Sequence, residues 1–78
     1  LWAQINHPGR QAMEPINKDL KAPSAVPLKS GRRKDATKKI PIALSESQIL
    51  AIIESFGNTA IILKDAGFTG VQIHGAHG

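Results

Sequence analysis

The segment that most restricts the fold is residues 45–66, which carry the pattern of one long amphipathic helix. Ser45 suits the N-cap position, and Gln48 three residues later fits a capping box. Gly67 follows the last turn, where a left-handed C-cap favours glycine. Apolar residues recur at spacings of three and four: Ile49, Ile52, Ile53, Phe56, Ala60 and Leu63. The segment therefore predicts a helix with one apolar face that other structure must cover.

Two short strand patterns flank this helix. Residues 1–6 alternate in character from one position to the next, and residues 70–74 read Gly-Val-Gln-Ile-His, so both predict strands. Residues 8–42 hold five prolines and no helical period, which predicts a long irregular loop, with a small hairpin between Lys29 and Lys38. A strand–helix–strand order implies a parallel pair with a right-handed crossover. We therefore expect an α/β fold ordered strand, long loop, helix, strand.

Composition narrows the class of protein. The 78 residues suffice for one small domain with a marginal core, and the absence of cysteine excludes disulfides and thiolate metal sites. No apolar run reaches the roughly 20 residues that cross a bilayer, and no signal-peptide pattern opens the chain. We therefore expect a cytoplasmic protein without a membrane partner. Because Leu1 starts a strand pattern without a lead-in, we also expect an internal piece of a longer protein.

A basic segment at residues 29–39 carries most of the net charge of +4. Its cations are Lys29, Arg32, Arg33, Lys34, Lys38 and Lys39. Such a run can contact phosphate, so a nucleic-acid-binding module is one alternative function. No aromatic residue is interleaved with the cations, although aromatics are what single-stranded nucleic acid stacks on. A solvated loop without a nucleic-acid partner is therefore the favoured interpretation.

Polar side chains stand at the carboxyl ends of both predicted strands, which is where parallel α/β folds bind ligands. Gln4 and His7 belong to the first strand end, and His74 and His77 to the second. The Gln4 amide offers a donor and an acceptor, which suits the edge of a heterocycle, although it can equally bond neighbouring backbone. Arg10, which follows the first strand, either lies on the surface or closes over an anion.

The two histidines are separated only by Gly75 and Ala76, which leave room for a ligand to approach. Two imidazoles can donate hydrogen bonds to an oxygen that gains negative charge, or can bind a metal with His7 as a third ligand. No cysteine and no nearby carboxylate supports the metal reading, and we expect none. Spacing alone leaves an oxyanion site, a metal site and an incidental pair open.

Three stretches resemble the NADH:flavin oxidoreductases, the old yellow enzyme family. Residues 3–11, Ala-Gln-Ile-Asn-His-Pro-Gly-Arg-Gln, resemble the segment after the third strand of that family, and residues 22–27, Ala-Pro-Ser-Ala-Val-Pro, resemble a following loop segment. Residues 66–78, which end in Gln-Ile-His-Gly-Ala-His-Gly, resemble the fourth strand and its active-site end. The resemblance implies that residues 1–78 are part of an FMN-binding (β/α)8 TIM barrel, from about the third strand to the end of the fourth, with the long loop 8–42.

The resemblance also implies an ene-reductase activity, in which hydride passes from NADH or NADPH through FMN to an activated alkene or a related electrophile. Gln4 would contact the flavin ring, and His74 and His77 would bond the oxygen of a small-molecule substrate such as an enone or a nitro compound. The family's tyrosine and phosphate site fall outside this chain, so we expect the piece alone to be inactive. The whole parent would be a flavoprotein and is a candidate homo-oligomer. A metal-dependent barrel hydrolase that uses His7, His74 and His77 is the alternative enzyme.

Overall fold

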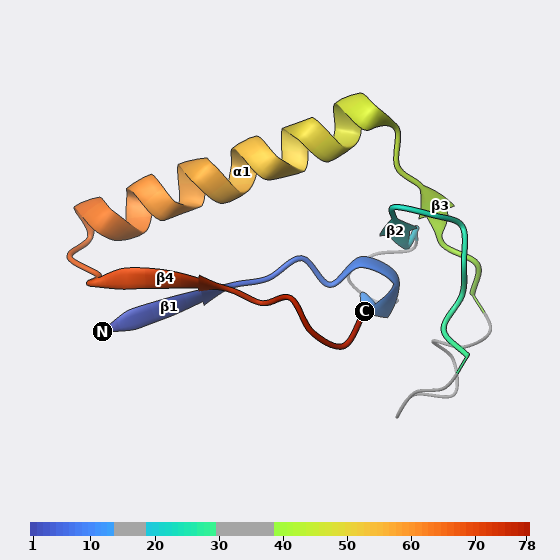
Figure 1. Ribbon diagram of the computed structural model, residues 1–78, viewed down its shortest axis with the longest axis horizontal. Coiled ribbons are helices and arrows are strands. Elements are labelled where there is room, and N and C mark those ends of the chain that lie inside the picture. The colour runs from blue at the N-terminus through green and yellow to red at the C-terminus, as the bar shows by residue number, and fades with distance from the viewer. Residues whose placement is uncertain (14–18, 30–38) are drawn as a thin grey trace. The chain divides into compact units, whose positions relative to one another are not determined.

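The computed structural model describes residues 1–13, 19–29 and 39–78 (Figure 1). The chain divides into two compact units, which we call the strand–helix unit and the loop unit. The strand–helix unit holds Leu1–His7 and Glu46–His77, and the loop unit holds Pro8–Ser45 and Gly78.

Two parallel strands form the sheet of the strand–helix unit, β1 (Trp2–Ile5) and β4 (Gly70–Ile73). Their register aligns Gln4 with Gln72. The ladder continues one residue past β4, because the backbone N–H of His74 donates to the Ile5 carbonyl oxygen at 2.9 Å. The strands predicted over residues 1–6 and 70–74 and their parallel pairing are therefore confirmed.

The predicted helix is α1 (Glu46–Asp65), which begins immediately after Ser45. Its carboxyl end is a Schellman motif: Gly67 has a φ of 96°, its N–H donates to the Lys64 oxygen, and the Phe68 N–H donates to the Leu63 oxygen, each at 3.0 Å. This left-handed glycine reverses the chain from helix into β4, as the sequence predicted.

The helix lies on one side of the paired strands (Figure 1). Strand alternation points Ala3, Ile5 and Val71 to that side, and all three are half-buried. The expected apolar stripe of α1 is also half-buried, except at Ile53, which is 60% exposed. Ile53 stands at the margin of the stripe, and the two-stranded sheet is too narrow to cover that margin.

The loop unit contains more regular structure than the sequence predicted. Leu20, Ala22 and Pro41 are buried. Backbone hydrogen bonds also join residues 20–22 to residues 42–44: the Ile42 N–H donates to the Leu20 oxygen at 2.7 Å, and the Leu44 N–H donates to the Ala22 oxygen at 2.8 Å. Within the predicted loop over residues 8–42, backbone pairing and apolar burial therefore organise some of the described residues locally. The elements of the loop unit are the 3-10 helix η1 (Gly9–Gln11) and the parallel strands β2 (Lys21–Ala22) and β3 (Ile42–Ala43).

Arg10 makes two side-chain hydrogen bonds within the loop unit. Its Nη1 donates to the carbonyl oxygens of Val26 at 3.0 Å and Pro27 at 3.2 Å. The structure therefore adds a further role to the two that the sequence left open: Arg10 links η1 to the backbone at Val26 and Pro27. The hairpin expected between Lys29 and Lys38 lies outside the described residues.

The architecture of the described residues is α/β, with two separate two-stranded parallel sheets and no closed sheet. Within the same residues, no helix has the length and apolar character needed to cross a membrane.

Candidate functional site

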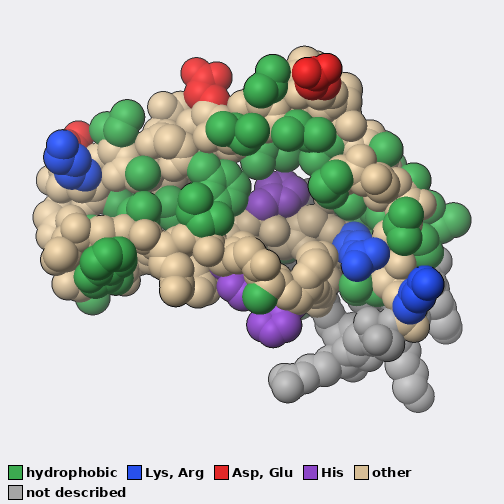
Figure 2. Space-filling view, viewed as in Figure 1, with side chains coloured by type: hydrophobic (Ala, Val, Ile, Leu, Met, Phe, Trp, Pro, Cys, Tyr) green, Lys and Arg blue, Asp and Glu red, His purple; other side chains and the backbone are tan. Residues whose placement is uncertain are grey.

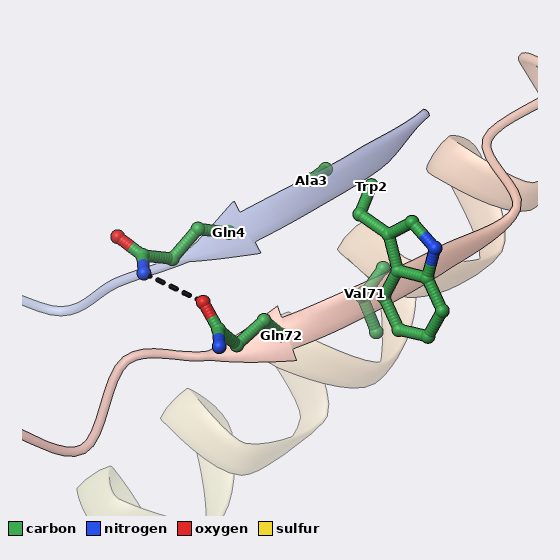
Figure 3. A pocket seen from close by; sticks show the side chains of 5 residues that line it. All are labelled: Trp2, Ala3, Gln4, Val71 and Gln72. Atoms are coloured by element: carbon green, nitrogen blue, oxygen red, sulfur yellow. Dashed lines mark hydrogen bonds between the residues drawn. The ribbon is translucent and has the colours of Figure 1, made fainter.

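One face of the β1–β4 sheet is turned away from α1 and carries polar and aromatic side chains. Strand alternation places Trp2, Gln4 and Gln72 on this face, and all three are exposed. A hollow of about 310 Å³ is lined by Trp2, Ala3, Gln4, Val71 and Gln72. Figure 3 shows these five side chains. A concave surface with convergent polar groups is what a small ligand needs.

A pair of amides occupies this face. Gln4 Nε2 donates to Gln72 Oε1 at 2.8 Å, and Figure 3 shows the two side chains pointing toward one another from adjacent strands. The bond forms because the two residues are register partners in a parallel pair. Gln4 thus bonds a side chain rather than the backbone. Its Oε1 and second amide hydrogen have no partner among the described residues.

Sequence reasoning singled out Gln4 and missed Gln72. The signal was the same in both cases, an amide inside an otherwise apolar strand, since Gln72 lies between Val71 and Ile73. What the sequence did not show is the register, which decides that these two amides meet.

Trp2 lies over Gly70 on the same face. A Cβ atom at Gly70 would stand only 2.6 Å from Trp2 Cζ3, 2.7 Å from Cη2 and 2.9 Å from Cε3, so a larger residue would displace the indole. The absence of a side chain at position 70 therefore lets the ring lie flat across the strand pair at the amino end of this face.

The two histidines come together just beyond the carboxyl end of β4. The ring centroids of His74 and His77 are 5.4 Å apart, and the ring planes are inclined by 35°. His74 is half-buried and His77 is exposed. His74 follows Gln72 by two positions along a ladder that its own N–H continues, so strand alternation assigns both side chains to the face opposite α1. Figure 2 shows histidine side chains, in purple, at the surface.

His77 has a φ of 65°, the only positive value at a non-glycine position among the described residues. Left-handed backbone at such a residue costs free energy and is often kept where it aims a functional side chain. This left-handed residue ends the short segment in which the His77 ring lies beside that of His74.

A metal triad does not form in the described parts of the chain. No group of three or more His, Cys, Asp or Glu side chains stands close enough to hold a metal ion there. His7, His74 and His77 are all described, so the geometry gives no support to the hydrolase that the sequence left open.

Most of the basic segment predicted over residues 29–39 lies outside the described residues, including Arg32, Arg33, Lys34 and Lys38.

Comparison with known proteins connects this chain to a family. The family model described as NADH:flavin oxidoreductase / NADH oxidase family matches residues 1–78. The chain is 40% identical over 75 residues to an NADPH dehydrogenase of Bacillus cytotoxicus, with 96% of this chain and 19% of that protein covered. It is 37% identical over 75 residues to an NADPH dehydrogenase of Bacillus pumilus, with 96% of this chain and 20% of that protein covered. The chain thus spans about a fifth of the length of these relatives. No solved structure matches it significantly.

Proposed function

Because this chain belongs to the NADH:flavin oxidoreductase / NADH oxidase family, we propose that it is part of an FMN-dependent enzyme that uses NADPH or NADH to reduce an activated alkene or a related electrophile. The observation that carries the proposal is the parallel pairing of β1 and β4. Parallel strands end at one edge, so Gln4 and the two histidines come to the same end of the sheet.

The proposed setting is a (β/α)8 TIM barrel in a longer parent protein, of which residues 1–78 form a partial FMN-binding domain. In this proposed barrel, β1 and β4 correspond to about the third and fourth strands, and α1 is the crossover helix between them. Two features support this placement: α1 covers one face of the strands only, and ligand-type side chains gather on the other face toward the carboxyl ends. Residues 8–42 would then correspond to the long loop that follows the third barrel strand.

The residues on the exposed face fit a flavin ring. FMN, when bound, supplies the two-electron chemistry that links the nicotinamide to the substrate. The ring's pyrimidine edge carries carbonyl oxygens and an N–H, and the unpartnered Oε1 and amide hydrogen of Gln4 match such an edge. Gln4 would therefore hold and orient the ring beside the hollow on this face.

His74 and His77 would bind the substrate. With centroids 5.4 Å apart and planes inclined by 35°, the two imidazoles can both donate to a single carbonyl or nitro oxygen placed between them. Reduction of a conjugated alkene builds negative charge on that oxygen, so the same two bonds strengthen as the reaction proceeds.

Homo-oligomerisation of the parent protein and its cytoplasmic location stay predictions.

The test uses the full-length parent protein. Its visible spectrum is expected to show flavin bands that NADPH bleaches and an enone restores. We expect His74→Ala to leave the flavin bound and to weaken binding of a phenol by roughly tenfold or more, because the bound phenolate mimics the charged substrate oxygen and loses one of its hydrogen bonds.

His7→Ala serves as a control, since His7 is exposed and stands outside the pair. A colourless parent that holds one tightly bound zinc would refute the flavin proposal. A yellow parent whose phenol affinity is the same with and without the His74 imidazole would refute only the role of that residue.

A further inference from the structure

We propose that Gln72 is a positioning residue for Gln4: it holds the Gln4 side chain in place, so that the Gln4 amide can meet the edge of the flavin ring. The inference rests on the proposed function and adds a residue to it. It starts from the bond between Gln4 Nε2 and Gln72 Oε1, which is 2.8 Å long.

The bond fixes where the Gln4 amide lies. Gln4 Nε2 donates to Gln72 Oε1, so one amide hydrogen of Gln4 is engaged on the β4 side, and its Oε1 and second amide hydrogen are left for a ligand. Because each glutamine carries both a donor and an acceptor, the bond holds the Gln4 side chain in place in either sense. Gln72 therefore restrains the position of the amide that would meet the ring edge.

Both glutamines are exposed in this chain, so no packed core among its described residues restrains their side chains, and the cross-strand bond is the restraint that the structure shows. A free glutamine side chain has three rotatable bonds, and ordering it on ligand binding costs free energy. The cross-strand bond orders Gln4 before the ligand arrives.

A purely structural tie between strands is the competing interpretation. The two strands are already joined by their backbone ladder, whose register pairs all four residues of each strand. An exposed amide–amide bond adds little to such a ladder, because water competes for both partners. A structural role would show itself in unfolding, whereas a positioning role shows itself in flavin affinity that depends on Gln4.

The experiment measures FMN affinity of the flavin-free full-length parent by quenching of flavin fluorescence. We expect Gln72→Leu to weaken FMN binding by roughly fivefold to tenfold, which corresponds to one poorly oriented hydrogen bond. Gln72→Glu keeps an acceptor oxygen at the same distance from the backbone and is expected to stay within roughly threefold of the native affinity. Asn58→Leu removes an exposed amide from α1 and is the matched control, with no change expected.

A double-mutant cycle decides whether Gln72 acts through Gln4. In a Gln4→Leu background, Gln72→Leu is expected to cost no further affinity, because there is no amide left to orient. Equal losses in both backgrounds, or an unchanged affinity of Gln72→Leu in the native background, would overturn the inference while leaving the flavin proposal intact. A parent that binds no FMN would overturn both. If Gln72→Leu fails to fold, Gln72→Met has a similar length without the acceptor and takes its place.

Discussion

The strand–helix unit has a helix of 20 residues and a regular parallel ladder, yet none of its side chains is buried. The loop unit has strands of only two residues, yet it buries Leu20, Ala22 and Pro41. Regular structure and burial are therefore separated in this chain. The first follows from local sequence pattern, whereas the second requires that apolar surfaces find a partner.

The apolar surfaces of the strand–helix unit lack such a partner within the described chain. Figure 2 shows hydrophobic side chains, in green, along the helix. The exposed ones on α1 are Leu50, Ile53, Ile61 and Ile62. A two-stranded sheet with one helix is marginal by itself, so this unit depends on the rest of the proposed barrel far more than the loop unit does. The candidate site residues belong to the dependent unit.

The largest expected effect concerns the isolated 78 residues. We expect their FMN dissociation constant to lie above about 1 μM, because tight ligands have roughly 70–90% of their surface buried and this unit offers one open face. Flavin fluorescence titration of the isolated chain beside the full-length parent measures the difference. Sub-micromolar affinity of the isolated chain would show that the strand–helix unit binds FMN without the rest of the barrel, which would contradict the proposed difference between the two units.

The next effect contrasts one leucine from each unit. Leu20 is 4% exposed, so Leu20→Ala is expected to lower the unfolding free energy by about 2–3 kcal/mol in both the isolated chain and the parent. Leu50 is 59% exposed, so Leu50→Ala is expected to cost less than about 0.5 kcal/mol in the isolated chain. In the parent, neighbouring structure would cover Leu50, and the cost is expected to rise above about 1 kcal/mol. Urea unfolding followed by circular dichroism measures all four values, and an unchanged cost for Leu50→Ala would count against the barrel.

A smaller effect tests the sheet face itself. Gly70→Ala places a Cβ within 3 Å of three Trp2 ring atoms, so the indole must move. Because Trp2 is 67% exposed and can turn into solvent, the cost is expected to be about 1 kcal/mol or less. Trp2 is the single tryptophan of the chain, so its fluorescence spectrum reports the displacement directly. An unshifted spectrum with unchanged stability would mean that the indole does not lie over Gly70.

The smallest effect has the opposite sign. A Cβ at Gly57 would meet nothing within 4 Å, and the position lies within α1. Gly57→Ala is therefore expected to raise the unfolding free energy of the isolated chain by about 0.5–1 kcal/mol through helix propensity alone. A loss of stability in the parent, but not in the isolated chain, would identify Gly57 as a contact point for a neighbouring element there.

Sequence patterns predicted the elements of the strand–helix unit to within one residue, because strand alternation, helical period and the Gly67 cap are local signals. They did not predict the pairing of β2 with β3, since two-residue strands have no period to detect and their pairing joins positions about twenty residues apart. At the site, His74 and His77 were predicted as a pair from their spacing. Gln72 was missed because its significance comes from the register with Gln4, which no local pattern contains.

The two hydrogen bonds of Arg10 have a consequence for which positions of the loop unit can change in sequence. Both acceptors are main-chain carbonyl oxygens, at Val26 and Pro27, and every residue type carries that oxygen. Val26 is also 51% exposed, so its side chain is not needed to keep these bonds. A mutational library at position 26 can therefore sample new side chains without releasing the arginine, whereas most substitutions at position 10 remove the donor of both hydrogen bonds. This stretch of the loop can therefore vary in sequence while its backbone shape stays the same.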